Sequence, residues 1–525
     1  MKKIILFTIS ILCLLFTTSC SDWLDVLPNN EQITDNYWKS KEDVEAVVAS
    51  GYYYMRESVP SFVKWGELRG GAIYSNNSSD TKLQDFNLTP SYELCGYSSL
   101  YKAIGMANSV IKYAPTVRDI DDTYYESVMN SHLCEALFIR SYCYLVLLKN
   151  YKEVPLITDA YVDDTENFDQ AKSSDTLIVK QIKDDIKTAL ETGAAKGTYE
   201  TDWQTKGRAT KWALYALMAD VCLWNEDYDE CIQYCDMILN ATDSFRPVFM
   251  TNTADWFTMF YPGNSNESIF ELNWDYATSQ ETNNFASLYG QSATSRLRPT
   301  QLACQKMKTE TQTLKDRGYT DGARMGRMLL ATYVPDNGVA TGWTTSNQYY
   351  LWKYYGTDVQ DISGGARTHQ DANFILYRVA EIMMIKAQAL TMEGNYMGAV
   401  TLINKIRTRA GLGNFNDIDT NSDDAQQQIS QLDELTILEE ILNQKEMEFM
   451  GEAKRWYDLL WFGKISNYKY EKQFITMVLE GNQTTNISWI QSVLQDHNAW
   501  YMPIPQSDID HNKLLVQNPY YSTTK

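Results

Sequence analysis

The stretch from residue 377 to residue 412, YRVAEIMMIKAQALTMEGNYMGAVTLINKIRTRAGL, decides the fold. Apolar residues recur along it, and just ahead of it, with the spacing of one helix face. They are Ile375, Val379, Ile382, Met383, Ala387 and Leu390. Gly394 and Asn395 interrupt the pattern, and a second helix is expected from about Tyr396 to Arg409, ended by Gly411. The stretch therefore predicts two helices joined by a short turn.

An upstream stretch, WALYALMADVCLWNEDYDECIQYCDMIL at residues 212–239, has the same layout and aligns with the first without a gap. The matched positions are Ala219 and Ala387, Tyr228 and Tyr396, Cys231 and Ala399, and Ile232 and Val400. Small side chains at such positions let paired helices approach closely, which is typical of tetratricopeptide repeats. The alternative is a pair of unrelated amphipathic hairpins.

Helical patterns also cover much of the remaining chain. They run from about Ser40 to Arg56, Cys95 to Tyr113, Asp121 to Asn150, Asp175 to Thr192, Leu432 to Met450 and Ala453 to Trp461. Residues 57–94 and 243–374 differ, because they are rich in Gly, Asn, Ser, Thr and aromatics and hold only short strand-like runs, such as Ser268 to Leu272 and Tyr349 to Tyr355. Loops of this length are usually functional. We therefore expect a mainly α protein whose tetratricopeptide-like helix pairs carry a loop-rich, partly β, ligand-binding face.

No linker rich in Pro, Ser or Gly divides the chain, so we expect one continuous body. It would consist of an N-terminal helical part (20–242), a loop-rich insert (243–374) and a C-terminal helical part (375–525).

The first residues, MKKIILFTISILCLLFTTSC, have the layout of a secretory signal peptide. Their apolar run is shorter than the roughly 20 residues of a membrane-spanning helix. Small residues stand directly before Cys20, which resembles a bacterial lipobox; the alternative is an ordinary signal followed by chance by a cysteine. We expect removal of residues 1–19 and acylation of Cys20. Two or more acyl chains hold a protein on a membrane stably.

Composition narrows the class of partner. The formal charge of −21 becomes −23 once Lys2 and Lys3 leave with the signal peptide. Such acidity argues against nucleic acid, whose binding rests on Lys and Arg. After the signal peptide no stretch approaches a second membrane span. Of 9 cysteines, those beyond Cys13 and Cys20 show no paired or zinc-binding spacing, so most are expected to be buried small hydrophobes rather than disulfide partners.

Several stretches together resemble the SusD/RagB family of Bacteroidetes surface lipoproteins. They are CSDWLDVLPNNEQIT (20–34), LYKAIGMANSVI (100–111), RATKWALYALMADVCLW (208–224), LRPTQLACQKM (297–307), YRVAEIMMIKAQAL (377–390) with INKIRTRAGL (403–412), EFMGEAKRWYDLLWFGK (448–464) and WYMPIPQSDIDHNKLLVQNPYY (500–521). Each motif is weak alone, but they follow the family's order over the whole mature chain.

The resemblance implies a helical body tethered to the outer face of the outer membrane, lying as a lid over a SusC-like TonB-dependent transporter. It implies the capture of oligosaccharide at the cell surface and its delivery to that transporter, although some relatives carry peptides. The chain departs from the family at three places: Tyr97 replaces a frequent Trp, Gly71 an acidic residue, and Gln444 with Lys445 a Glu-Arg pair. The first two touch the face where relatives bind ligand, so the substrate is not carried over.

A sugar-binding site needs flat aromatic faces for C–H surfaces, and amide or carboxylate groups for hydroxyls. Both loop-rich regions supply them. The candidates are Trp65, Tyr74, Asn76, Asn77 and Asp80 in the first region, with Tyr97 just after it, and Trp274, Tyr276, Asn283, Asn284, Tyr289, Trp343, Tyr349 and Tyr350 in the second. Each of these aromatics could instead pack in the core. Tyr74, Trp274, Tyr276 and Trp343 have polar neighbours and favour binding more. Trp456, Trp461 and Trp500 are expected to pack.

Catalysis finds little support. The 4 histidines fit no zinc or haem motif, no G-x-S-x-G elbow occurs, and His369 is expected on the surface. We therefore expect no enzyme and no cofactor. Asp417, Asp419, Asn421 and Asp423 begin like a calcium loop, but Ser422 and Gln428 replace its Gly and Glu, so a solvated loop is expected and a looser calcium site is the alternative.

Two groups of charged residues could bind an anion, but structural ion pairs are favoured. They are Arg378 with Glu381, and Arg407 with Arg409. A helix C-terminus attracts cations without any ligand.

The leading hypothesis is thus a cell-surface glycan-binding lipoprotein. The alternatives are a peptide-binding, RagB-like member of the same family, and a structural lid of the transporter without ligand specificity of its own.

Overall fold

A computed structural model describes residues 37–75, 77–161, 167–283, 285–289, 297–318, 327, 332–333, 350–357, 367–482 and 486–522. Helices dominate them, as expected, and the strands form only two-stranded pairs. One cluster of buried apolar side chains extends from Val44 to Leu515 and so joins elements from both ends of the described chain.

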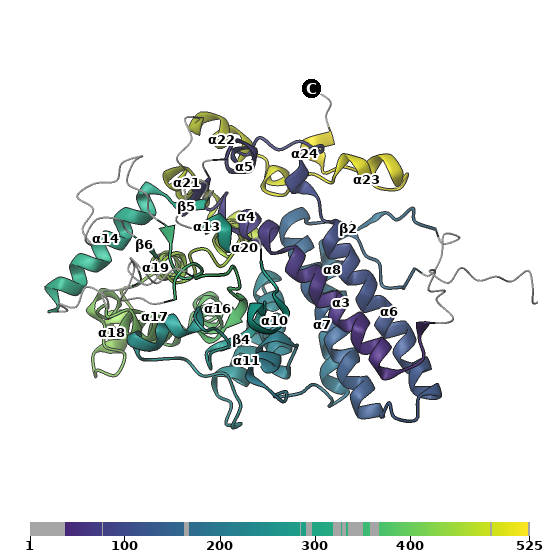
Figure 1. Cartoon of the computed structure of the whole chain (residues 1–525). Coiled ribbons are helices and arrows are strands. Elements are labelled where there is room, and N and C mark those ends of the chain that lie inside the picture. The colour runs from purple at the N-terminus through teal and green to yellow at the C-terminus, as the bar shows by residue number, and fades with distance from the viewer. Residues whose placement is uncertain are drawn as a thin grey trace, which may run out of the picture.

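Four long helices pack side by side on the right of Figure 1. They are α3 (Lys41–Glu57), α6 (Ser98–Ile120), α7 (Glu126–Tyr151) and α8 (Asp175–Glu191). A capping box starts α3: the backbone N–H of Ser40 donates to Asp43 (2.8 Å), and that of Asp43 donates back to the Ser40 hydroxyl. Helix α6 continues past the expected end at Tyr113, through Pro115.

Helix α7 is long and apolar enough to cross a membrane, which the sequence-based expectation overlooked. However, 94% of its most apolar window is buried inside the protein. We therefore assign α7 to the core of the four-helix group.

The predicted helix pairs are present as α10 (Lys211–Trp224) with α11 (Tyr228–Leu239), and α16 (Val379–Met392) with α17 (Tyr396–Arg409). Their turns match in detail. Asp227 (φ −85°, ψ 65°) and Asn395 (φ −85°, ψ 68°) have the same backbone conformation. Each also donates its N–H to the carbonyl five residues earlier, at 2.9 Å and 2.8 Å. The alignment of the two stretches thus reflects a structural repeat.

The first helix of the second pair begins later than the apolar spacing indicated. Ile375 belongs to strand β8 (Phe374–Arg378), and α16 starts only at Val379. Strand β8 pairs antiparallel with β4 (Ser268–Leu272), one of the predicted strand-like runs. Backbone pairing with β4 therefore overrides the helical spacing here. In the described part of the other predicted run, residues 350–355, Tyr350–Leu351 forms a strand, β7, which pairs with β6 (Thr332–Tyr333).

The regions expected to be loop-rich contain more helix than predicted. Residues 57–94 hold α4 (Val59–Glu67), α5 (Ser78–Gln84), η2 (Glu93–Cys95, running to the region's end) and β1 (Ile73–Ser75); residues 243–374 hold η3 (Thr253–Met259), α12 (Tyr276–Ser279), α13 (Ala286–Tyr289), β5 (Leu297–Pro299) and α14 (Gln301–Asp316). Strands β1 and β5 pair antiparallel and so connect the two regions.

The remaining elements complete the helical body. They are β2 (Val154–Pro155), β3 (Lys172–Ser173), α9 (Asp202–Gly207), η5 (Phe415–Asp417), α18 (Ala425–Ile429), α19 (Glu434–Glu448), α20 (Arg455–Tyr468), α21 (Glu471–Gly481), α22 (Ile487–Val493), η6 (His497–Trp500), α23 (Gln506–His511) and α24 (Pro519–Ser522). As predicted, Trp456, Trp461 and Trp500 pack in the core, and the seven described cysteines are buried and form no disulfide with one another.

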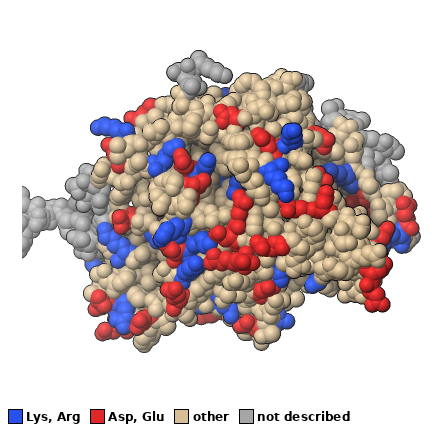
Figure 2. Space-filling model, turned by 180° about the vertical axis from the view of Figure 1, so that it is seen from behind, with Lys and Arg blue, Asp and Glu red and all other residues tan. Residues whose placement is uncertain are grey.

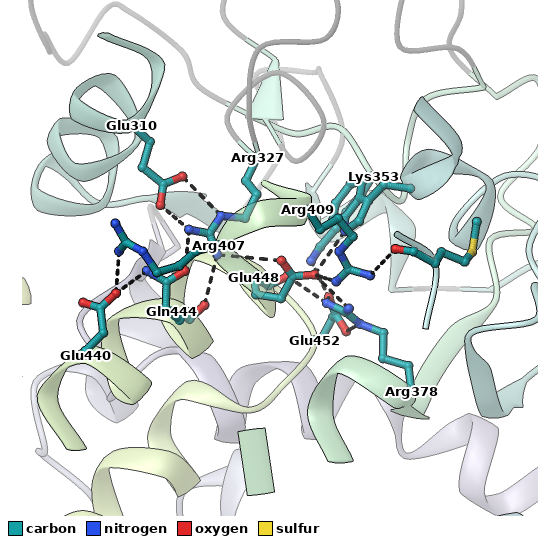
Figure 3. A network of polar contacts seen from close by, with 12 residues as sticks. Glu310, Arg327, Lys353, Arg378, Arg407, Arg409, Glu440, Gln444, Glu448 and Glu452 are labelled. Carbon is teal, nitrogen blue, oxygen red and sulfur yellow. Dashed lines mark hydrogen bonds and ion pairs between the residues drawn. The ribbon is translucent and has the colours of Figure 1, made fainter. Parts of the chain in front are cut away.

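A buried network of charges joins the C-terminal elements (Figure 3). Glu448 accepts hydrogen bonds from Arg378 (2.8 Å) and Arg409 (2.7 Å). Arg378 also binds Glu452 (2.8 Å), and Arg407 pairs with Glu440 (2.6 Å). These arginines therefore form structural ion pairs, as predicted. The partner of Glu381 differs from the expectation: it pairs with Lys454 (2.9 Å), because Arg378 ends strand β8 and its side chain binds Glu448 and Glu452.

Candidate functional site

The aromatic candidates near β1 lie mostly inside the protein. Trp65 is 1% exposed and donates its indole N–H to the carbonyl of Leu94 (2.7 Å). Tyr97 is 5% exposed and meets Tyr151 edge-on at 5.0 Å between ring centroids. Their rings have no free face for a sugar, so we correct both assignments from binding to packing.

The polar candidates of this region support local structure. Asp80 is fully buried, where it pairs with Lys64 (3.0 Å) and accepts from the Ser75 hydroxyl (2.9 Å), so its assignment is also corrected. Asn77 caps α5 by accepting from the backbone N–H of Ser79 (2.9 Å). Tyr74 is half-buried in β1, and burial raises the pKa of its hydroxyl.

Two candidates of the second region are likewise buried. The Asn283 amide donates to the carbonyl of Ala372 (2.8 Å), and the Tyr289 hydroxyl donates to that of Gly451 (2.9 Å). Both side chains bind neighbouring backbone segments, so we correct their assignments from ligand binding to structural contacts. Cys20, Asn76, Asn284, Trp343 and Tyr349 lie outside the described residues, as does the side chain of Tyr350.

Trp274 and Tyr276 are the described candidates of the second region that reach the surface. Both are half-buried and follow directly on β4. Trp274 packs on Phe285 (5.5 Å between centroids) and lies 5.7 Å from the guanidinium of Arg56. Tyr276 stacks on His369 at 3.5 Å, and His369 is exposed, as predicted.

Next to Trp274, a hollow of about 300 Å³ opens between α3, α9 and the end of β4. Tyr53 and Trp203 line it, and they are 47% and 56% exposed. Neither residue is among the candidates predicted from the sequence. The available signal was a large aromatic among polar neighbours, as Trp203 stands in TDWQTKG. We call this hollow, with Trp274 beside it, the aromatic pocket.

The charged groups of the aromatic pocket already have partners. Arg56 forms two hydrogen bonds to Glu281 (2.7 and 3.1 Å), which lower the pKa of that carboxyl. Arg208 binds Glu135 through two further hydrogen bonds (3.0 and 2.8 Å) and reaches Glu45 (3.2 Å). With its charges balanced, the pocket suits an uncharged polar ligand with apolar faces.

Over the face seen in Figure 2, Lys and Arg are interspersed with Asp and Glu and form no continuous basic area. A nucleic-acid-binding surface would need such a basic area to contact successive phosphates.

One group of possible metal ligands converges in the part of the chain that the structure describes, namely Cys222, Asp227 and Glu230. The ammonium of Lys183 already lies between the two carboxylates, at 2.8 Å and 2.5 Å, and burial raises the pKa of the Cys222 thiol. The group is therefore an ion pair beside a thiol. The segment from Asp417 to Asp423, expected as a solvated loop with a calcium site as the alternative, is not among the converging groups of the described residues. There Asp419 accepts from the backbone N–H of Asn421 (2.9 Å).

Comparison with known proteins covers most of the chain. The family described as "SusD family" matches residues 253–521, and the one described as "Starch-binding associating with outer membrane" matches residues 22–223. SusD-like protein P38 of Formosa agariphila is 25% identical over 478 residues, which are 84% of this chain and 88% of that protein.

Solved structures have the same fold. A SusD-like protein of Bacteroides fragilis aligns with a TM-score of 0.67 and 20% identity, over 93% of this chain and 98% of its own. A structure described as a laminarin-binding SusD-like protein aligns with a TM-score of 0.66 and 19% identity, over 92% of this chain and 100% of its own.

Proposed function

The chain belongs to the SusD family, and from this we propose that it binds an oligosaccharide or polysaccharide at the cell surface and delivers it to a SusC-like TonB-dependent transporter of the outer membrane. The family description of its N-terminal part names starch binding and the outer membrane, and one similar structure is described as laminarin-binding. These descriptions favour a glucan-type or related neutral glycan as the first ligand to test.

The observation that carries the proposal is the aromatic pocket. Tyr53, Trp203 and Trp274 offer aromatic surface beside arginines that are already paired with carboxylates. Sugar rings bind such surface through their C–H faces, and their hydroxyls find amide and backbone partners at the rim. In this proposal the protein binds and does not catalyse.

Calorimetry with neutral glycans, starch and laminarin oligosaccharides included, tests the pocket. We expect Trp203→Ala and Trp274→Ala each to raise Kd by about fivefold to tenfold, because each loses one stacking face. Trp489→Ala is the matched control, since Trp489 is 43% exposed but lies on α22. Trp343→Ala tests the candidate outside the described residues.

Three results would contradict the assignment. If both pocket variants bind as tightly as the wild type, the ligand binds elsewhere. If peptides bind and glycans do not, the RagB-like alternative holds. If neither binds while the protein still associates with its transporter, the structural-lid alternative holds.

The membrane anchor has its own test. We propose that acylation of Cys20 holds the protein on the outer membrane, since a thiolate is nucleophilic enough to take up the lipid. Cys20→Ser should therefore move the protein from the membrane fraction to the soluble fraction. A variant that stays in the membrane fraction would contradict the lipid anchor.

A further inference from the structure

A second, larger hollow lies apart from the aromatic pocket, in the second helix pair. It measures about 790 Å³, within the range of ligand sites, and shares no lining residue with the aromatic pocket. One wall is the face of α16 and α17, and the others are the segment that follows α11 and the loop that holds Asp419. We call it the repeat groove.

Basic residues predominate among the charged residues that line the repeat groove. They are Arg246, Lys386, Lys405 and Arg409, against the single carboxylate of Asp419. Because the chain as a whole carries a formal charge of −21, a basic lining is a local property of this groove.

Two of these cations are already neutralised and two are not. Lys386 pairs with Asp236 (2.5 Å), and Arg409 pairs with Glu267 and Glu448. Arg246 donates to the backbone carbonyl of Asp243 (2.8 Å), and Lys405 is exposed. Arg246 also acts electrostatically on the Asp243 carboxylate, but that carboxylate is already paired with Lys211 (2.8 Å). Among the described residues neither Arg246 nor Lys405 forms an ion pair of its own, so both keep donors for an anionic ligand.

The rest of the lining has the polarity of a sugar site. Thr408, Asn414 and Thr420 present hydroxyl and amide groups, and Phe249 presents an aromatic ring that lies against the Arg409 guanidinium at 4.1 Å. The lining residues come from helices and loops and none from a strand, so an extended peptide would find no strand edge on which to pair its backbone. Hydroxyls and C–H faces fit this lining better than a peptide backbone does.

We propose that the repeat groove is a second carbohydrate site, specific for oligosaccharides that contain uronic acid. Lys405 and Arg246 bind the sugar carboxylate by charge-assisted hydrogen bonds, and the Thr and Asn side chains bind its hydroxyls. The site goes beyond the proposed function, because it selects for charge and lies on other elements than the aromatic pocket.

The test is calorimetry with a short oligogalacturonate and a neutral oligosaccharide of equal length. We expect the wild type to prefer the uronate, and Lys405→Gln with Arg246→Gln to weaken its binding at least about tenfold. The preference should also shrink when salt is raised from about 0.05 to 0.5 M. Lys513→Gln removes the same charge from an exposed lysine near α23 and is the matched control.

The remaining outcomes overturn the proposal. It fails if the wild type does not bind the uronate, or if the double variant, with an unchanged melting temperature, binds it as tightly. Poly-glutamate that binds the groove more tightly than the uronate would point to an acidic peptide instead. Trp203→Ala separates the two sites, because it should weaken neutral glycans and leave uronate binding intact.

Discussion

The carboxyl group of Glu67 lies at the end of α4, fully buried. One of its oxygens accepts from the backbone N–H of Lys454 (3.3 Å), while the other has no hydrogen-bond partner among the described residues. Burial raises the pKa of this carboxyl to about 8, although Lys353 acts in the opposite direction. The folded protein therefore favours the protonated form of Glu67.

Glu67→Gln should remove one source of pH dependence. Since the folded pKa lies above the unfolded one, the protonated carboxyl favours the fold at low pH, and that advantage is lost as the pH rises from about 4.5 to about 8. Over this range the wild type should lose stability relative to the variant by at most about 1.4 kcal/mol per pH unit. Urea unfolding between about pH 4.5 and pH 8 measures this difference in unfolding free energy. Glu93→Gln, which changes an exposed carboxyl, is the control. A constant difference between wild type and Glu67→Gln would refute the assignment.

At the same scale, the sequence identified the kinds of site residue but not their exposure. Trp65 follows Lys64 and Trp203 follows Asp202, so each stands next to a charged residue, yet one is 1% and the other 56% exposed. The difference is one of tertiary structure: Tyr151, from a distant helix, packs against Trp65, while Trp203 stays largely exposed among the described residues. Local sequence therefore marks Trp203 and Trp274 as aromatics among polar residues, but it does not show that they lie near each other at one pocket.

Among the elements, the two repeat turns follow one geometry with different residues. Gly394 has a φ of +74° in the second turn, and Glu226 has a φ of 64° at the matching place in the first. Only glycine adopts this left-handed conformation without steric cost. The conserved shape of the turn thus comes from the packing of the helix pairs, and Glu226 follows it at some cost in strain.

Gly394→Ala isolates that cost. A Cβ at this position would meet no atom within 4 Å, so the change introduces backbone strain without a clash. We expect a loss of about 1 to 2 kcal/mol in unfolding free energy, measured by chemical denaturation. Gly105→Ala is the control: its Cβ would also meet nothing within 4 Å, but it lies inside α6, where alanine should stabilise by about 0.5 to 1 kcal/mol. Shifts of the same sign in both variants would contradict this account.

Periodicity predicted the long helices well and failed where another interaction competed. Helices α3, α8, α10 and α17 begin within a few residues of their predicted starts, where a cap or a turn marks them. Ile375 fits the helical spacing, but it lies opposite Glu271 of β4, and the backbone there forms a β-ladder instead of a helix. Helix α14 is not among the predicted helices. Its helix-forming residues, such as Leu, Ala, Gln, Lys and Met, lie within a long region whose average composition is typical of loops.

For the whole molecule, the network around Glu448 connects elements far apart in the chain. Arg378 ends β8, Arg409 ends α17, and Glu448 ends α19 (Figure 3). Burial acts to raise the pKa of Glu448, but Arg409, Arg378 and Arg327 hold it well below its usual value. These charges lie under the repeat groove, because Arg409 also lines that groove. The network therefore fixes one wall of a proposed site as well as the core.

Glu448→Gln should destabilise the protein by about 3 to 5 kcal/mol at neutral pH, because it removes the carboxylate that Arg378, Arg409 and Arg327 share and leaves the buried network one negative charge short. Since the folded pKa of Glu448 lies well below the unfolded value of 4.5, its contribution is complete above pH 4.5 and is lost as the pH falls from there towards the folded pKa. The gap between wild type and variant should thus narrow in acid. Urea unfolding between about pH 7 and 3.5 measures it. Asp184→Asn, in the exposed pair with Lys180, should cost less than about 0.5 kcal/mol. If the loss at Glu448 is equally small, the network does not hold these elements together.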